Sequence, residues 1–240
     1  MDLAEEFDVR MRLAARPAVA ATTFKTDSGQ LQLSDWLALA APGPGLLILD
    51  GVLAAQVRVG DRVAAELVGA GDLLQPWLSN EAELVCEAGW RALTPVRFAL
   101  LDAEFAHRVQ PWPQIMAALL RRAGRRTRHL NVQRAIAAQP RLDVRLALLL
   151  WHLGARWGKV EPGGIHLCLP LTHQLLAWLV GAERPSVSHA LARLSHSGVV
   201  SGQGDEWHLH GSVEQLTSME DSGGRGEQLL VPIALPSRRA

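Results

Sequence analysis

The chain has 240 residues, which is enough for one large domain or for two modest domains that each bury a core. Its 24 basic and 24 acidic side chains cancel, and 48% of its residues are hydrophobic, a composition typical of a globular protein. No apolar run reaches the roughly 20 residues that span a bilayer, and the acidic start MDLAEEFDVR lacks the basic and apolar regions of a secretory signal. We therefore expect a cytoplasmic protein with no membrane partner.

The charges are distributed unevenly along the chain. Residues 1–120 carry 9 basic and 15 acidic side chains, residues 121–200 carry 12 and 3, and residues 201–240 carry 3 and 6. A basic block between two acidic blocks is expected where one region of a protein meets phosphates. A solvated helix face would explain the arginines of 121–134, but not the scarcity of acids in the whole block.

The N-terminal half begins with a short amphipathic pattern around Leu3 to Leu13 and then changes character. From Leu31 to Leu101, short apolar runs alternate with glycine-containing turn signals, a pattern that predicts an antiparallel β-roll or barrel. The runs are 45–49, 52–59, 63–67, 84–86 and 96–101, and the turn signals are Asp50-Gly51, Gly60-Asp61, Gly71-Asp72 and Ala88-Gly89.

Helical patterns occupy the middle of the chain. A short helix is predicted over Asp102–Val109, and a long one follows from about residue 114 to residue 138, where Gln139-Pro140 ends it. The apolar positions of the long helix are Ile115, Leu119, Leu120, Ala123, Leu130 and Ile136. An almost wholly apolar helix is then predicted over Leu142–Trp157, with a loop at 158–164.

The stretch from Leu167 to Val200 contains two short helical patterns that meet at Gly181. Thr172 is placed as the N-cap of the first helix, and Gly181 allows a positive φ in the connection. Gly198 supplies a stop signal for the second helix. Apolar residues recur on one face of each pattern, at Leu175, Leu176, Leu179 and Val180 and at Val187, Ala190, Leu191 and Leu194. This spacing predicts a helix-turn-helix, although an ordinary helical corner in a core has the same pattern.

The residues around this motif make the prediction more specific. Val199-Val200 and the run from Trp207 to Leu209 flank a turn signal at 202–205, which predicts a hairpin. A strand is predicted at 165–169, before the motif, where it could pair with that hairpin. Strand, helix, turn, helix and hairpin together form a winged helix-turn-helix.

The segment LPLTHQLLAWLVGAERPSVSHALARLSHSGVV, with the following wing and the preceding RLALLLWHLGARWG, resembles the DNA-binding domain of Crp/Fnr-type transcription regulators. This resemblance implies an α+β chain with an N-terminal antiparallel β-roll, a long dimerisation helix and a C-terminal winged helix-turn-helix. The long helix would pair with that of a second copy through its apolar face from Ile115 to Ala123, and the polar residues that follow would make this seam short or interrupted. A surface helix on a monomer is the alternative. The expected divisions are a sensor-like domain at 1–110, a linker helix at 111–139, a DNA-binding domain at 140–212 and an extension at 213–240.

The turns Asp50-Gly51 and Gly71-Asp72 are spaced much as in the β-roll of cyclic-nucleotide-binding domains. In nucleotide-binding members of the family, a Gly-Glu pair and then an Arg-Ser pair follow the second turn and hold the ribose and the cyclic phosphate. Here the turn is followed by LLQPWLSNEAELVCEAGW, and the first arginine is Arg91. An unpaired phosphate in a partly buried pocket costs several kcal/mol. We therefore expect no cyclic AMP binding in the usual mode.

The resemblance assigns roles on the predicted DNA face. Thr172, His173 and Gln174 match residues that touch phosphates, and Arg184 matches the family's main guanine reader. Pro185 stands where several members have a base-reading glutamate, and His189 replaces a second common arginine, so the half-site should differ from the best-known one. The further residues of this polar face, including the candidate secondary readers, are Ser186, Ser188, His189 and Arg193.

Double-stranded DNA, a second copy of the chain and RNA polymerase are the partners that the resemblance implies. A small-molecule effector stays open, and its binding residues and any cofactor are unassigned. The alternative function is a ligand-sensing or protein-interaction module whose winged helix does not read DNA. No catalytic motif is present, so an enzyme is not expected.

Cysteine and histidine positions give no recognised metal motif. Cys86 and Cys168 form no CxxC pair and are expected to be buried thiols. The spacing of His166, Cys168 and His173 crosses a strand–helix junction and matches no compact zinc pattern, so we expect no metal site. Haem sensing through a histidine such as His107 or His129 stays open.

Overall fold

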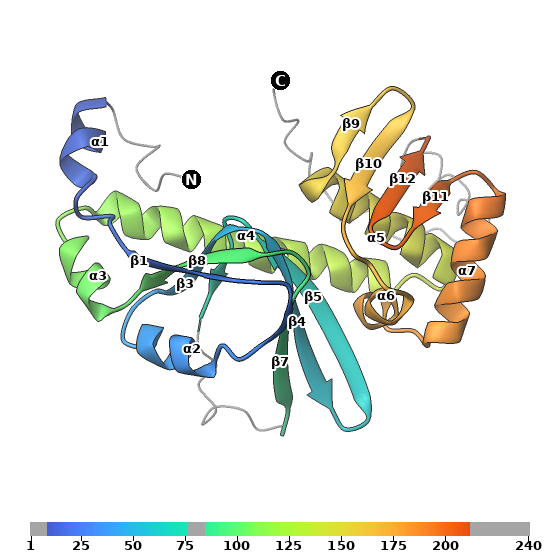
Figure 1. Ribbon diagram of the computed structural model, residues 1–240, viewed down its shortest axis with the longest axis horizontal. Coiled ribbons are helices and arrows are strands. Elements are labelled where there is room, and N and C mark those ends of the chain that lie inside the picture. Colours follow the sequence, from blue (N-terminus) through green and yellow to red (C-terminus); the bar gives the residue numbers. More distant parts are fainter. Residues whose placement is uncertain (1–8, 76–84, 212–240) are drawn as a thin grey trace, which may run out of the picture.

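The computed structural model describes residues 9–75 and 85–211. They form an N-terminal β-roll, a long helix that runs along it, and a C-terminal domain of three helices around a small sheet (Figure 1). The predicted α+β fold is confirmed. Of the predicted N-terminal helix, α1 (Val9–Ala15) lies within the described part, whereas the extension at 213–240 lies outside it.

The β-roll consists of two four-stranded antiparallel sheets, with strand orders β1-β8-β3-β6 and β2-β7-β4-β5. Its core lies between them, where side chains such as Ile48, Leu53 and Phe98 are fully buried. The strands are β1 (Thr22–Thr26), β2 (Gly29–Leu31), β3 (Gly45–Asp50), β4 (Val52–Val59), β5 (Arg62–Gly69), β6 (Leu73–Leu74), β7 (Glu87–Ala92) and β8 (Val96–Leu101).

Three of the predicted turns are confirmed, because Gly51, Gly60 and Gly71 all have positive φ, at 85°, 59° and 96°. A Cβ at Gly51 would also lie 2.2 Å from the backbone oxygen of Pro95, so this turn requires glycine on two grounds. After Gly71, the buried Leu73 and Leu74 form β6.

Several predictions in this half were wrong. Val85 and Cys86 lie outside any strand, and the predicted turn at Ala88-Gly89 is inside β7, where it pairs with β4. Neither Cys86, which is half-exposed, nor Cys168, which is exposed, is the buried thiol that we expected. The elements β1, β2 and α2 (Ser34–Ala40) were not predicted, because their polar and alanine-rich segments lack a clear apolar period.

Two helices connect the roll to the C-terminal domain. The short α3 (Ala103–Arg108) begins at Asp102, whose carboxylate accepts a hydrogen bond from the Phe105 N–H at 2.8 Å. The long helix α4 (Pro113–Ala137) has 25 residues, as predicted, and Pro113 stands at its start. Ile115 and Leu119 are buried against the roll of their own chain, which leaves Leu120 exposed at 69%. The expectation that these apolar side chains face a second copy is therefore wrong for Ile115 and Leu119.

The C-terminal domain begins with α5 (Leu142–Trp157), whose apolar face forms the floor under the sheet and the other helices. The sheet has the order β11-β12-β10-β9. Its strands are β9 (Lys159–Glu161), β10 (Gly164–Cys168), β11 (Val200–Gln203) and β12 (Glu206–His210). The pairing predicted between the strand before the motif and the hairpin is confirmed. The predicted loop at 158–164 was wrong in part, since Pro162-Gly163 turns the chain back and lets β9 pair with β10.

The roll and the C-terminal domain share one hydrophobic core. Val52, Ala54, Ala65, Leu67 and Leu93 of the roll pack in the same cluster as the apolar faces of the C-terminal helices. Because this cluster is continuous, the two parts of the chain are packed together rather than merely tethered by α4.

Polar contacts also stabilise the junction between the roll and the C-terminal domain. The buried Asp72, beside the Gly71 turn, forms an ion pair with Arg156 of α5, and Glu66 of β5 forms one with Arg126 of α4. The Nε2 of Gln133 donates hydrogen bonds to the carbonyls of Ala65 at 2.7 Å and of Leu179 at 3.1 Å. One side chain of α4 therefore joins β5 to the helix that contains Leu179.

Within the described residues, no helix is long and apolar enough to cross a bilayer.

Candidate nucleic-acid interface

The first helix of the motif, α6 (His173–Val180), begins where the sequence predicts. The Oγ1 of Thr172 accepts a hydrogen bond from the Leu175 N–H at 3.1 Å, which caps the helix. Leu175, Leu176, Ala177, Leu179 and Val180 are all buried in the shared core. This packing fixes which face of α6 stays outside.

The connection between the two helices depends on Gly181. Its φ of 66° and ψ of 47° place it in the left-handed region, and the Ala182 N–H turns back to the carbonyl of Ala177 at 2.9 Å. A Cβ at this glycine would meet nothing within 4 Å, so glycine serves the backbone conformation and not a close approach. The predicted turn is confirmed.

The second helix, α7 (Arg184–His196), presents one buried and one exposed face. Val187, Ala190, Leu191 and Leu194 pack into the core as predicted. Arg184, Ser186, His189 and Arg193 are exposed. Pro185 lies in the first turn, where a helix needs no N–H from it. The positively charged Arg184 is therefore presented at the N-terminal end of an exposed polar face.

Two of the predicted site residues bond to each other. The Nδ1 of His173 lies 2.8 Å from the Oγ of Ser188, whose hydroxyl also lies 3.2 Å from the carbonyl oxygen of Arg184. Ser188 is therefore occupied between α6 and α7, which reduces its freedom to reach a base. Arg193 has a weaker partner, the carboxylate of Asp143 on α5 at 3.9 Å.

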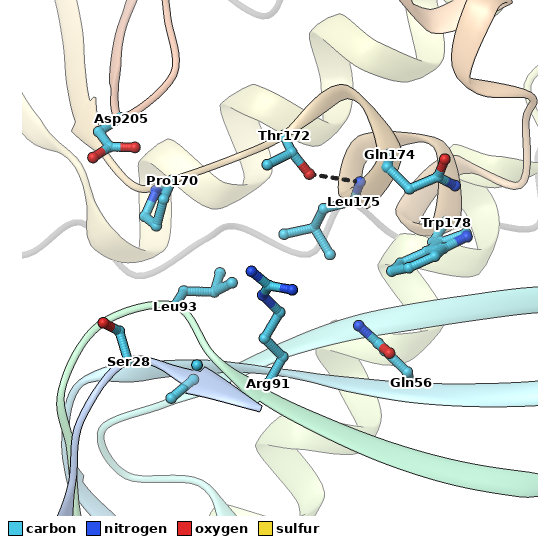
Figure 2. A pocket seen from close by; sticks show the side chains of 12 residues that line it. Ser28, Gln56, Arg91, Leu93, Pro170, Thr172, Gln174, Leu175, Trp178 and Asp205 are labelled. Atoms are coloured by element: carbon cyan, nitrogen blue, oxygen red, sulfur yellow. Dashed lines mark hydrogen bonds between the residues drawn. The ribbon is translucent and has the colours of Figure 1, made fainter. Parts of the chain in front are cut away.

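Thr172 and Gln174 face the β-roll across a pocket of about 480 Å³ (Figure 2). In this view Arg91 extends from β7 toward α6, and Gln56 lies below Gln174 and Trp178. Gln174 also lines a second pocket, of about 550 Å³, between the β4–β5 hairpin and the turn at Gly181. This proximity was not predicted, because no local sequence pattern indicates which roll residues α6 will face.

A further ion pair joins the roll to the start of α7. Arg62, near the tip of the β4–β5 hairpin, contacts the carboxylate of Glu183, the residue that precedes Arg184. Both side chains are largely exposed, at 74% and 67%. The roll thus touches α7 at its N-terminal end, next to the predicted guanine reader Arg184.

The wing is a hairpin with a tighter turn than the sequence suggested. Gln203 pairs with Glu206, so only Gly204 and Asp205 connect the strands. Trp207 anchors the hairpin, because the residue is only 2% exposed and its Nε1 donates to the carbonyls of Gly204 at 3.1 Å and Leu169 at 3.3 Å.

Comparisons with known proteins agree with this geometry. Residues 144–211 match the model of the Crp-like helix-turn-helix domain. The CRP-like cAMP-activated global transcriptional regulator of Mycobacterium tuberculosis (strain CDC 1551 / Oshkosh) is 33% identical over 116 residues. That match covers 47% of this chain and 50% of the relative, so the chain spans about half the length of the curated relative that it matches.

Solved structures with the same overall fold cover more of the chain. A CooA mutant from Carboxydothermus hydrogenoformans aligns with a TM-score of 0.60 and 18% identity, over 83% of this chain and 87% of that one. The c-di-GMP responsive global regulator CLP of Xanthomonas campestris aligns with a TM-score of 0.59 and 18% identity, over 83% and 98%. The likeness extends through both the β-roll and the C-terminal domain, and the chain thus has the fold of Crp/Fnr-type regulators.

Proposed function

We propose that this chain, whose residues 144–211 form a Crp-like helix-turn-helix domain, is a sequence-specific DNA-binding transcription regulator of the Crp/Fnr type that acts as a homodimer. In this proposal residues 1–110 are the sensor-like domain, 111–139 the linker and dimerisation helix, and 140–212 the DNA-binding domain. RNA polymerase as a further partner rests on the family resemblance alone.

The observation that carries this proposal is the exposed polar face of α7, which begins with Arg184 and lies opposite a fully packed apolar face. A helix of this kind fits the major groove with its N-terminal residues on the base edges. A bidentate contact from Arg184 to a guanine contributes roughly 1–3 kcal/mol of discrimination against a wrong base. Ser186 and His189 are the accessible secondary readers, since Ser188 is bonded to His173.

Phosphate contacts are assigned to the start of α6 and to Arg193. The first backbone N–H groups of α6 have no carbonyl partner within the helix, which favours an anion beside Thr172, His173 and Gln174. The basic block at 121–200 supports the same assignment, because sequence-independent affinity for DNA comes mainly from neutralised phosphates.

The decisive experiment separates base reading from phosphate contact. Operator sequences are first selected from random DNA with the full chain, and binding of the selected and random sequences is then measured for two variants. Arg184→Ala should relax the preference at one base step of each half-site. Gln174→Ala should weaken binding about equally for all sequences. If Arg184→Ala lowered the affinity for both DNAs by the same factor, Arg184 would be only a phosphate contact.

The alternative, a module whose winged helix does not read DNA, is favoured by one observation. Thr172 and Gln174 line a pocket against the roll, so DNA must enter that pocket or the roll must move away from α6. Retention of the wild-type chain on DNA distinguishes the two functions. A regulator loses affinity steeply as salt rises, whereas failure to bind any DNA at low salt would support the alternative.

The sensor is proposed to respond to something other than cyclic AMP in the usual mode. The strand after the Gly71-Asp72 turn carries the buried Leu73 and Leu74 where nucleotide-binding members have a Gly-Glu pair, and residues 76–84 lie outside the described part of the chain. Calorimetry with cyclic AMP should show no tight binding, and a micromolar or better dissociation constant would contradict this reading.

A further inference from the structure

The outer face of the wing sheet carries a group of side chains that the proposed DNA reading does not use. His166 of β10 is paired directly with His208 of β12, and Cys168 is paired with Glu206. Side chains two residues apart on a strand point to the same face, so all four lie on one face. The intervening Leu167 and Trp207 are buried on the other face, which places this group toward solvent.

The donor atoms of this group lie close together. The Nε2 of His166 is hydrogen-bonded to the carboxylate of Glu206, and the Sγ of Cys168 lies 3.6 Å from the other oxygen of that carboxylate. The rings of His166 and His208 stack with their centroids 4.6 Å apart and their planes at 7°. One ligand atom from each of His166, Glu206 and His208 lies within 4.8 Å of the others.

We propose that His166, Glu206 and His208, with Cys168 as the fourth ligand, bind a divalent transition-metal ion of the zinc class. Imidazole nitrogen, thiolate and carboxylate are the donors that Zn²⁺ takes in tetrahedral sites. Bonds of about 2.1 Å to nitrogen and oxygen separate tetrahedral donors by about 3.4 Å. The most distant of the three donors within 4.8 Å therefore need to approach by up to roughly 1.4 Å, whereas the hydrogen-bonded Nε2 of His166 and carboxylate of Glu206 must move apart. The Sγ of Cys168 is not among these three donors, so it must also move toward them. Rotation about the broad χ2 torsion of the histidines allows such adjustments.

A second contact supports the site. The Nδ1 of His166 lies 3.6 Å from the carboxylate of Glu161 on β9, while its Nε2 points at Glu206. Metal-ligating histidines commonly donate their other ring N–H to a carboxylate, which fixes the ring and makes it a better ligand. The positive charge of Lys159, which is paired with His166 on β9, disfavours a bound cation.

The sequence could not indicate this group, because its two halves, each with ligands at i and i+2, lie about 40 residues apart. The nearer candidate, His173, is not part of it and is bonded to Ser188 instead. A metal held here would join β10, which leads into α6, to β12 of the wing. Binding would release the proton of the Cys168 thiol and would stabilise the C-terminal domain.

The test uses the full chain after chelator treatment, titrated with Co²⁺ as a spectroscopic substitute for Zn²⁺. We expect one Co²⁺ per chain with the strong visible bands of a four-coordinate site, together with a near-ultraviolet thiolate band that Cys168→Ser removes. His208→Ala and Glu206→Gln should each weaken Co²⁺ binding by about tenfold or more. The matched control is His210→Ala, on the same strand and bonded to Ser201, which should leave the affinity unchanged.

Thermal unfolding with and without Zn²⁺ provides a second measurement. Zn²⁺ should raise the Tm of the wild-type chain and of His210→Ala but not that of His208→Ala, and a metal-free Tm of His208→Ala near the wild-type value shows that this variant folds. If its metal-free Tm falls, His208→Gln replaces it in the same comparison. The proposal is overturned if the wild-type chain binds no Co²⁺, if its thiolate band is missing, or if the His208 and Glu206 variants bind as tightly as His210→Ala does.

Discussion

The ion pair between Asp72 and Arg156 should stabilise the protein far more than the one between Arg62 and Glu183, although both join the roll to the C-terminal domain. The side chains of Asp72 and Arg156 are only 6% and 15% exposed, against 74% and 67% for the other pair. Asp72 also accepts a hydrogen bond from the Gly69 N–H at 2.8 Å. The Arg156 → Leu change would therefore leave a carboxylate that is almost buried and has lost its cation.

Removing one partner of a fully buried pair costs about 3–5 kcal/mol. An open pocket of about 290 Å³ borders Asp72 and Arg156, so water relieves part of this cost and we expect a loss of about 2–4 kcal/mol in the free energy of unfolding. Arg156 also donates to the Leu67 carbonyl at 3.2 Å and lies over the ring of Trp157 at 4.3 Å, contacts that disappear with it. At the exposed pair, Arg62→Ala should cost about 0–1 kcal/mol.

Urea unfolding at pH 7, followed by circular dichroism, measures both losses. A double-mutant cycle with Asp72→Asn isolates the pair itself from the lost contacts to Leu67 and Trp157. The combined variant should be less destabilised than the sum of the two single changes, because no charge is then left unpaired. Equal losses for Arg156→Leu and Arg62→Ala would refute the reasoning, since burial would then not determine the strength of these contacts.

Three further predictions concern pH, the turn and assembly. Burial, followed by the charges of His129 and Arg156, lowers the pKa of His152 from 6.5 to about 4. Between these two pH values the imidazole is protonated in the unfolded chain but not in the native state. Urea unfolding should show stability falling from pH 6.5 toward pH 4, by at most about 3 kcal/mol from this residue, and His152→Gln should flatten that dependence. Gly181→Ala should lower the free energy of unfolding by about 1 kcal/mol through its positive φ, and Gly181→Asn by less; equal, negligible losses would contradict the turn assignment. Sedimentation should show a dimer for the wild-type chain and a monomer for Leu120→Asp. Leu39→Asp, at another exposed leucine, should stay dimeric. If Leu120→Asp is still a dimer, the dimer interface does not include this face of α4.

The C-terminal domain could be predicted closely from the sequence because its signals are local. Thr172 caps α6 through a residue three positions away, and Gly181 terminates the helix through its own φ. Leu142 to Trp157 is apolar enough to be buried in any arrangement, and α5 has those bounds. In each case the residues that decide the structure lie within one or two turns of one another.

The contacts between distant segments could not be predicted in this way. Ile115 and Leu119 have the spacing of an apolar seam, and only the position of the roll shows that they are buried within their own chain. Nothing near Asp72 in the sequence identifies Arg156 as its partner, since 84 residues separate them. His166 and Cys168 were considered together with His173 because they are near in the chain, whereas the sheet register places His208 opposite His166 and Glu206 opposite Cys168.

The continuous core of the roll and the C-terminal helices has a consequence for how the molecule unfolds. Leu67 of β5 and Leu93 of the roll are buried in the same cluster as Leu175 and Val180 of α6, so opening the junction exposes apolar surface on both sides at once. Denaturation should therefore proceed as a single cooperative transition and not as two independent ones. A C-terminal fragment that began near residue 140 would expose the apolar surface that the roll covers in the full chain, and it should therefore self-associate. This is expected even though such a fragment contains all the elements of a winged helix-turn-helix.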